Sequence, residues 1–175
     1  MKRRLLKLFL LWLAIWSVPI GQLFAQTKES AAFDKLRDLA GNWEGTFAWS
    51  GARNATGKMG AQYYTSGNGS AVVENLTQDG VPSMTSVYHL DGTDLRLTHF
   101  CAAQNQPRLK ATTVDPDKGE ITFSFVDITN LRSPTGGHVE GLEIRFIAAD
   151  HVTLRFHFKS GDTDSQELVD LRRKA

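Results

Sequence analysis

Cysteine is almost absent from this 175-residue chain, and its scarcity excludes a fold held together by disulfides. The single cysteine, Cys101, has no partner for an intrachain disulfide, so stability must come from the packed core. Free cysteine is among the most buried residue types, so we expect Cys101 to be buried. It lies far from the amino end, and therefore it cannot be the lipid-anchored first residue of a processed chain.

The chain also lacks the short motifs that mark metal sites and nucleophilic catalysis. It contains no His-x-x-x-His or Cys-x-x-Cys spacing and no Gly-x-Ser-x-Gly elbow. Clusters of basic residues interleaved with aromatic residues, which are typical of nucleic-acid binding, are missing as well. We therefore predict no metal site, no bound cofactor and no nucleic-acid partner.

The amino end has the pattern of an export signal. Residues 2–4 are cationic, the run 5–18 is almost wholly apolar, and helix-breaking residues precede Ala25. This order predicts a secretory signal peptide over 1–25, cleaved after Ala25. The apolar run is shorter than the roughly 20 residues that a membrane-spanning helix needs, so we expect no stable membrane anchor after cleavage. The processed protein is expected in the periplasm or outside the cell.

The remaining residues, 26–175, are enough for one hydrophobic core and predict a single domain. Four of the 20 Lys and Arg residues precede position 26, and none of the 19 Asp and Glu residues does. The domain therefore carries 16 basic and 19 acidic side chains, a net charge of −3, although the whole chain has a net charge of +1.

Hydrophobic periodicity changes from helical to strand-like near residue 41. Residues 30–40 predict a short helix that Ser30 caps and Gly41 ends. Beyond it the period is two, and turn residues separate ten expected strands: 43–49, 58–65, 70–78, 83–90, 94–101, 108–114, 120–127, 139–148, 151–159 and 166–173. The spacing predicts an all-β fold, an antiparallel up-and-down barrel of about ten strands with a short N-terminal helix.

One hairpin can be aligned residue by residue. Asp91-Gly92 is a strong two-residue turn signal, and pairing outward from it places Tyr88 opposite Leu95. The face that carries Tyr88, His99 and Cys101 is the more apolar one, so it should point into the barrel.

Two later strands have clear alternation. The first places Ile121, Phe123 and Phe125 inward and continues with Asp127 on the same side. The second places four apolar side chains inward: Val152, Leu154, Phe156 and Phe158.

The two ends of the domain resemble a known superfamily. A short helix followed by Gly41-Asn42-Trp43 is similar to the calycins, which include lipocalins and fatty-acid-binding proteins. In those proteins a Gly-x-Trp motif begins the barrel, and a basic residue of the last strand often packs over the tryptophan. The resemblance implies that Arg172 or Arg173 closes the barrel against Trp43, and a cation over an indole face contributes roughly 0.5–2 kcal/mol. Segments 88–92, 97–102 and 105–108 also resemble small uncharacterised exported bacterial proteins.

We predict that the barrel binds a small apolar or amphipathic molecule in its interior. Ligand cavities are mostly apolar with a few placed polar groups. Aromatic side chains would line the cavity, and a polar end would hold the head group, with Arg108 able to meet a carboxylate in bidentate fashion. The aromatic residues are Phe47, Trp49, Phe123 and Phe156, and the polar residues are Tyr88, His99 and Arg108.

Three other functions stay open from the sequence. A small barrel can be filled by its own side chains and serve only as a structural or interaction module. His99 could bind haem, as a single histidine does in haem-binding barrels that resemble calycins. The third is an enzyme in which His99 acts with Tyr88, Cys101 or Asp127.

Overall fold

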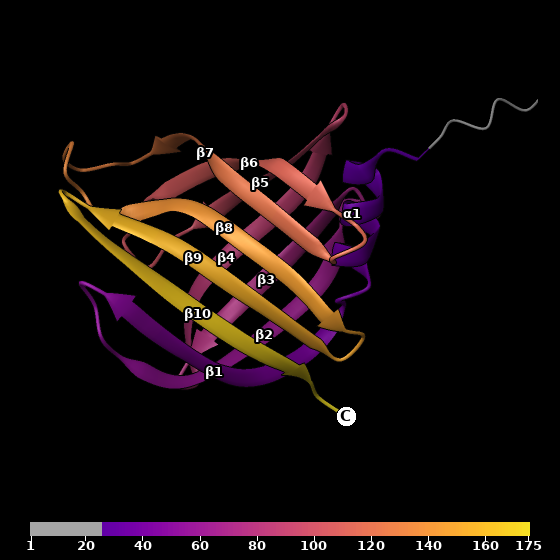
Figure 1. The fold of residues 1–175 in the computed structure, drawn as a ribbon, viewed down its shortest axis with the longest axis horizontal. Coiled ribbons are helices and arrows are strands. Elements are labelled where there is room, and N and C mark those ends of the chain that lie inside the picture. The colour runs from indigo at the N-terminus through magenta and orange to yellow at the C-terminus, as the bar shows by residue number, and fades with distance from the viewer. Residues whose placement is uncertain (1–25) are drawn as a thin grey trace, which may run out of the picture.

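The computed structural model describes residues 26–175, and the signal peptide predicted over 1–25 lies outside these residues. Ten antiparallel strands close into a barrel in which each strand pairs with the next and β1 pairs with β10 (Figure 1). The predicted fold class is confirmed, including the single short helix ahead of the strands. Within the described part of the chain, no helix is both long and apolar enough to cross a membrane.

The element bounds are close to those expected from the pattern of period two. They are α1 Lys28–Arg37, β1 Gly41–Gly51, β2 Thr56–Ser66, β3 Ala71–Gln78, β4 Val81–Asp91, β5 Asp94–Phe100, β6 Gln106–Asp115, β7 Glu120–Thr129, β8 His138–Ala148, β9 His151–Ser160 and β10 Thr163–Arg173.

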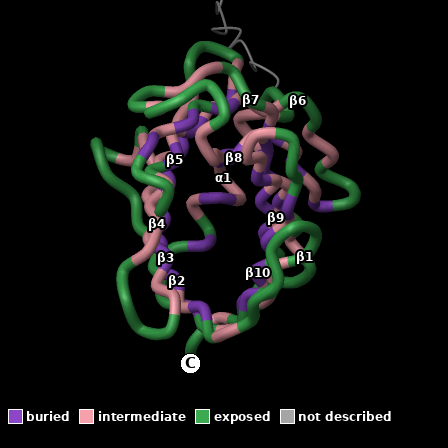
Figure 2. Tube along the Cα trace, turned by 90° about the vertical axis from the view of Figure 1, so that its left-hand side faces the viewer, coloured by how far each residue is buried: buried purple, intermediate pink, exposed green. Residues whose placement is uncertain are grey.

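Helix α1 begins earlier than predicted and closes one end of the barrel. Its N-cap is Thr27, whose hydroxyl accepts a hydrogen bond from the Ser30 backbone N–H at 3.1 Å, so the expectation that Ser30 caps the helix was wrong. Phe33 and Leu36 are buried, and α1 packs against β2, β4, β5 and β6. Figure 2 looks into the barrel from the opposite end, with α1 crossing the far side.

The β4–β5 hairpin turns one residue later than predicted. Asp91 pairs with Asp94, which places Gly92 in the turn with a φ of +61°, a conformation that glycine adopts without strain. Tyr88 therefore lies opposite Leu97, two residues further along β5 than predicted. Because side chains alternate with a period of two, this shift leaves the predicted inward face unchanged.

A bulge in β7 reverses one predicted orientation. Leu109 pairs with Phe125 and Arg108 pairs with Asp127, so Val126 is an extra residue in β7. Beyond the bulge, Asp127 points outward beside Arg108, and the expectation that it continues the inward set was wrong.

The interior is packed with side chains from all around the wall. The predicted inward residues of β9 are all buried, at 0 to 5% exposure: Val152, Leu154, Phe156 and Phe158. Phe47 packs directly on the β2 backbone, where a Cβ added at Gly57 would lie 2.5 Å from its ring. Six polar side chains are buried within this apolar core: Glu74, Ser86, His99, Asn105, Ser165 and Glu167.

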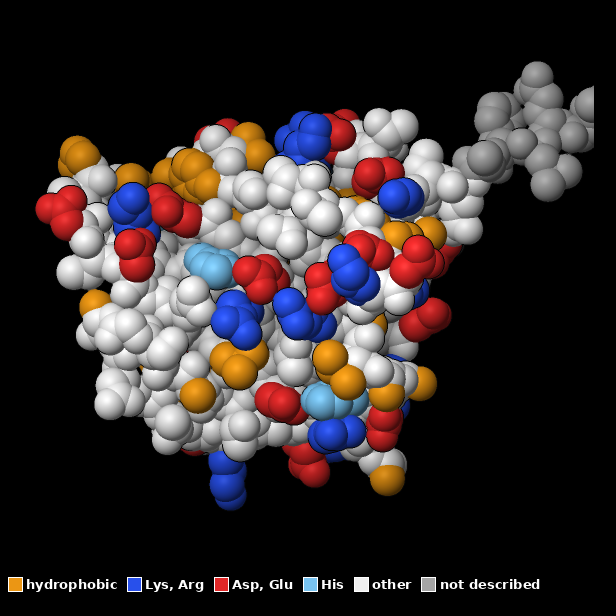
Figure 3. Space-filling view, in the orientation of Figure 1, with side chains coloured by type: hydrophobic (Ala, Val, Ile, Leu, Met, Phe, Trp, Pro, Cys, Tyr) orange, Lys and Arg blue, Asp and Glu red, His pale blue; other side chains and the backbone are white. Residues whose placement is uncertain are grey.

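The outer surface over β8, β9 and β10 is strongly charged. Figure 3 shows acidic and basic side chains interspersed across this face. His157 lies 2.9 Å from a Glu143 carboxylate oxygen, and His151 lies 3.0 Å from one of Asp170. The surface on this side is a set of paired opposite charges.

Candidate functional site

A cavity opens at the end of the barrel opposite α1, and we call it the mouth pocket. Its volume is about 170 Å³. Its lining residues come from five strands and from two adjoining loops: Trp49, Arg53, Met84, Cys101, Ala102, Ala103, Val139, Phe156, Phe158 and Glu167. The wall is mainly apolar and carries one basic and one acidic side chain, which is the usual composition of a ligand site.

Arg53 covers the aromatic side of the mouth pocket. It lies in the loop between β1 and β2, and its guanidinium carbon is 4.0 Å from the ring centre of Phe158 and 4.7 Å from that of Trp49. The two aromatic rings meet edge to face, with centroids 5.8 Å apart. A guanidinium over aromatic faces is attracted by their quadrupoles, so this loop residue is held at the entrance.

Glu167 supplies the acidic group of the mouth pocket. It is only 2% exposed and pairs across the β1–β10 ladder with Trp49. Burial raises the pKa of its carboxyl to about 7, although the charge of Arg53 and a hydrogen bond from Trp49 act in the opposite direction. A carboxyl that titrates near neutral pH inside a cavity is characteristic of functional sites.

Cys101 also faces the mouth pocket and is partly buried. Burial raises the pKa of its thiol, and the backbone N–H of Ala103 donates a hydrogen bond to Sγ at 3.4 Å. A thiol with a raised pKa is mostly protonated at neutral pH, and so it is a weak nucleophile.

Deeper in the barrel, four polar side chains form a line across β2, β3, β4 and β5. Tyr63 pairs with Glu74, Glu74 with Ser86, and Ser86 with His99. We call these four residues the buried polar row. Because they occupy the same level on neighbouring strands, their side chains project into one region of the interior.

Glu74 is the centre of this network. Its Oε2 accepts hydrogen bonds from the hydroxyls of Tyr63 at 2.7 Å and Tyr88 at 3.1 Å, and its Oε1 has no partner among the described residues. Burial raises the pKa of the Glu74 carboxyl and outweighs the hydrogen bonds that lower it. Burial also raises the pKa of both tyrosines. Folding therefore shifts all three groups toward their neutral forms.

His99 is fully buried, with Nδ1 3.0 Å from the Ser86 hydroxyl. Burial lowers its pKa to about 4, so the imidazole is neutral, and its Nε2 has no hydrogen-bond partner within residues 26–175. Its ring packs on Phe156 with centroids 5.1 Å apart. Since Phe156 lines the mouth pocket and His99 does not, a molecule in the pocket would meet the phenyl ring first.

The structure separates the predicted aromatic lining into two groups. Trp49 and Phe156 line the mouth pocket. Phe47 and Phe123 do not line it and belong to the packed core, where Phe123 lies against Tyr88 with ring centroids 6.0 Å apart. Burial does not distinguish the two groups, because Phe156 is also only 1% exposed.

The predicted polar end is not assembled. Tyr88 and His99 lie inside the barrel, but Arg108 lies on the outer surface. Its guanidinium forms a bidentate ion pair with Asp127, with nitrogen–oxygen distances of 2.5 and 2.6 Å. Asp127 also raises the pKa of Arg108. The guanidinium thus meets a carboxylate of its own chain on the outside of the barrel.

The ends of the barrel wall meet through Trp43 and Arg173. The guanidinium carbon of Arg173 lies 4.4 Å from the Trp43 ring centre, and the indole N–H donates to the Leu39 carbonyl at 2.8 Å. Arg172, the other candidate, is exposed and points away from the interior.

Sequence reasoning missed Glu74, Glu167 and Arg53. The two glutamates could have been found, because each continues an inward alternation: Glu74 between Val72 and Leu76, and Glu167 before Val169. Arg53 comes from a loop without periodicity, and nothing in the local sequence signals its stacking. Within the described residues, no group of three or more His, Cys, Asp or Glu side chains could hold a metal ion.

Solved structures with a similar fold include two bacterial proteins. One is a protein of unknown function from the DUF3598 family of Nostoc punctiforme, with a TM-score of 0.55 and 14% identity over 79% of this chain and 49% of that one. This chain thus spans about half the length of the Nostoc protein. The other is Rv2717c from M. tuberculosis, with a TM-score of 0.56 and 16% identity over 82% of this chain and 98% of that one. At these identities the likeness establishes the fold alone. No family model and no curated protein matches the sequence.

Proposed function

We propose that this protein is an exported, calycin-like binding barrel that holds a small amphipathic molecule at its open end. The observation that carries the proposal is the mouth pocket, an apolar cavity with Arg53 and Glu167 at its polar side. The export pattern of the amino end and the Gly41-Asn42-Trp43 opening of β1 support the compartment and the type of barrel.

The size of the cavity limits the ligand. An engineered apolar cavity of about 150 Å³ holds benzene, so the mouth pocket, at about 170 Å³, fits a group of one aromatic ring or a short branched chain. Phe156 and Phe158 would contact this apolar part. Longer molecules would extend out past Arg53, which lies in the loop between β1 and β2.

The polar groups favour an anionic or hydrogen-bonding end on the ligand. Arg53 presents a guanidinium that can pair with a carboxylate in bidentate geometry. Glu167, with a pKa of about 7, can donate a hydrogen bond when protonated and accept one when ionised. Benzoate combines a ring of the right size with such a head group and is a suitable probe.

The proposal is tested by NMR on the purified protein with benzoate as the probe. We expect the indole N–H resonance of Trp49, identified by its loss in Trp49→Phe, to shift on titration. The indole of Trp43 is the internal control, because it lies at the α1 end and donates to Leu39. Arg53→Ala should weaken binding about tenfold or more, since it removes the one basic group among the described residues that line the pocket.

Arg132→Ala is a matched control that removes an arginine from a loop outside the pocket. Equal shifts at Trp43 and Trp49, or unchanged affinity in Arg53→Ala, would place the probe elsewhere and reject the proposed site. Native mass spectrometry of protein purified from its source adds a second test, because a retained adduct gives the mass of the natural ligand.

A further inference from the structure

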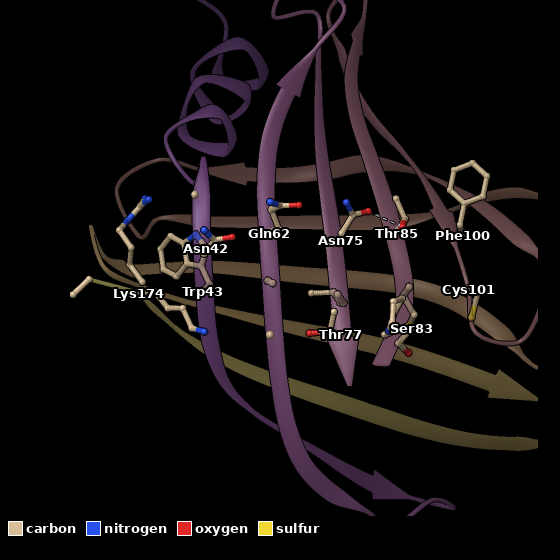
Figure 4. Close-up of a pocket in the computed structure, with 18 residues that line it drawn as sticks. Asn42, Trp43, Gln62, Asn75, Thr77, Ser83, Thr85, Phe100, Cys101 and Lys174 are labelled. Carbon is tan, nitrogen blue, oxygen red and sulfur yellow. Dashed lines mark hydrogen bonds between the residues drawn. The ribbon is translucent and has the colours of Figure 1, made fainter. Parts of the chain in front are cut away.

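A second hollow lies on the outside of the barrel, across β1 to β5, and we call it the outer groove (Figure 4). Its volume is about 1100 Å³ and it is open to solvent. It is separate from the mouth pocket, although Met84 and Cys101 border both.

Side chains on the groove floor form a straight row. Asn42 pairs with Gln62, Gln62 with Asn75, Asn75 with Thr85, and Thr85 with Phe100. Each of these residues follows or precedes an inward-facing neighbour, so their side chains share the outer face. Neighbouring strands are about 4.8 Å apart, and four such steps give the row a length of about 19 Å.

Uncharged hydrogen-bonding groups dominate the groove. Of the side chains that line it, only Arg173 and Lys174 are charged, and they lie at the C-terminal end, where Lys174 pairs with Glu44 at 3.2 Å. Charged pairs cover the β8–β10 face instead (Figure 3). The groove therefore selects against strongly charged ligands by offering few partners for them.

The amides of the row are available to a ligand. Among the side chains drawn in Figure 4, only one pair is hydrogen-bonded: the Thr85 hydroxyl donates to Asn75 Oδ1 at 2.8 Å. That bond orients the Asn75 amide, so its NH₂ group can donate to a ligand. Asn42 and Gln62 are exposed, and each offers both a donor and an acceptor.

Two further features shape the groove. Gly60 lies beside the row, and a Cβ there would come within 2.6 Å of the Thr77 hydroxyl oxygen, so the absence of a side chain keeps the floor low. Phe100 ends the row and is 47% exposed, which leaves one face of a large aromatic ring for stacking.

We propose that the outer groove binds a neutral, polyhydroxylated chain, an oligosaccharide that runs across the strands. Hydroxyl groups both donate and accept hydrogen bonds, as do the amides of Asn42, Gln62 and Asn75. The apolar face of a sugar ring stacks on an aromatic side chain such as Phe100. Because the strands are about 4.8 Å apart, a chain that crosses them would meet one side chain of the row on each strand. This site is independent of the proposed ligand of the mouth pocket.

Cellotetraose, a neutral β-linked probe, tests this inference by NMR at millimolar concentration. We expect the side-chain NH₂ resonances of Asn42, Gln62 and Asn75 to shift, while the Trp49 indole resonance of the mouth pocket stays in place. The double variant Asn42→Ala/Gln62→Ala should reduce affinity at least fivefold without unfolding the barrel, since both residues are exposed. Phe100→Ala should reduce affinity by a similar factor.

Gln166→Ala is the matched control, because it removes an outer-face amide of β10 that does not line the groove. The inference is overturned if cellotetraose leaves the three amide resonances unmoved, if the double variant binds as well as the parent, or if glucose alone at the same sugar concentration gives the same shifts. Preferential binding of an extended neutral peptide, such as tetra-alanine, over cellotetraose would also overturn it, in favour of a peptide site.

Discussion

The guanidinium of Arg173, near the end of β10, lies 4.4 Å from the ring centre of Trp43, near the start of β1. The same guanidinium donates hydrogen bonds to the carbonyls of Ala40 and Asp38, both at 2.7 Å. One side chain thus joins the first and last strands and the segment that follows α1.

Replacing Arg173 should therefore lower the free energy of unfolding. We expect Arg173→Met to cost about 1–2 kcal/mol, from the lost cation–π contact and the lost hydrogen bonds to backbone carbonyls. Urea unfolding followed by tryptophan fluorescence measures this. Arg172→Met is the control, because Arg172 is exposed, and equal losses in the two variants would refute a specific role for Arg173.

Replacing Glu74 should remove a pH dependence of stability. Because folding raises the pKa of the Glu74 carboxyl, the folded state keeps a proton that the unfolded state releases above a pH of about 4.5. Stability therefore falls as the pH rises from about 4.5 through the higher pKa that Glu74 has in the folded state. In Glu74→Gln the carbonyl oxygen can still accept from Tyr63 and Tyr88, and this fall should disappear. Unfolding in urea across the pH range measures it, in a Glu167→Gln background because Glu167 titrates with the same sign.

His99 should make the stability of the fold depend on pH with the opposite sign, so that stability is lost in acid. Its pKa falls from 6.5 to about 4 on folding, so its contribution is complete above 6.5 and is lost as the pH falls toward 4. The total loss is on the order of 3 kcal/mol. In thermal melts at a series of pH values, the melting temperature of His99→Gln should fall less steeply toward acid pH than that of the parent. A melting temperature that falls as steeply in the variant as in the parent would mean that other groups cause the acid sensitivity.

Binding of an anionic probe in the mouth pocket should depend on the state of Glu167. Below a pH of about 7 the carboxyl is mostly neutral and Arg53 supplies the net positive charge, whereas above it the carboxylate repels a second anion. Benzoate should therefore bind more weakly as the pH rises through 7. Glu167→Gln should hold the low-pH affinity at all pH values. Calorimetric titration measures both, and a pH profile unchanged in the variant would show that another group governs binding.

The sequence predicted the barrel well because period-two alternation and turn residues are local signals. The later turn at Gly92 and the bulge at Val126 were not predicted, since both depend on how two strands match each other along their length. A two-residue shift left Tyr88 and His99 inside. The one-residue bulge turned Asp127 outward.

The candidate site was predicted less well, and the reason is physical. Trp49 and Phe156 were expected to line a cavity and do line the mouth pocket. Whether an inward aromatic lines a cavity or fills the core depends on its depth, which alternation does not encode, so Phe47 and Phe123 were placed with the same group. Arg108 looked available in the sequence, but its partner Asp127 lies 19 positions away and meets it only through the folded register.

Because α1 packs across one end of the barrel, a ligand of the proposed mouth pocket would enter and leave at the opposite end, beside Arg53. A second ligand could not displace the first by entering from the α1 end. Release would have to precede the next capture, and for a ligand that extends past Arg53 it would require the guanidinium to leave the ring of Phe158. The residence time and the affinity are then coupled at one residue, so a change at position 53 should alter the off-rate more than the on-rate.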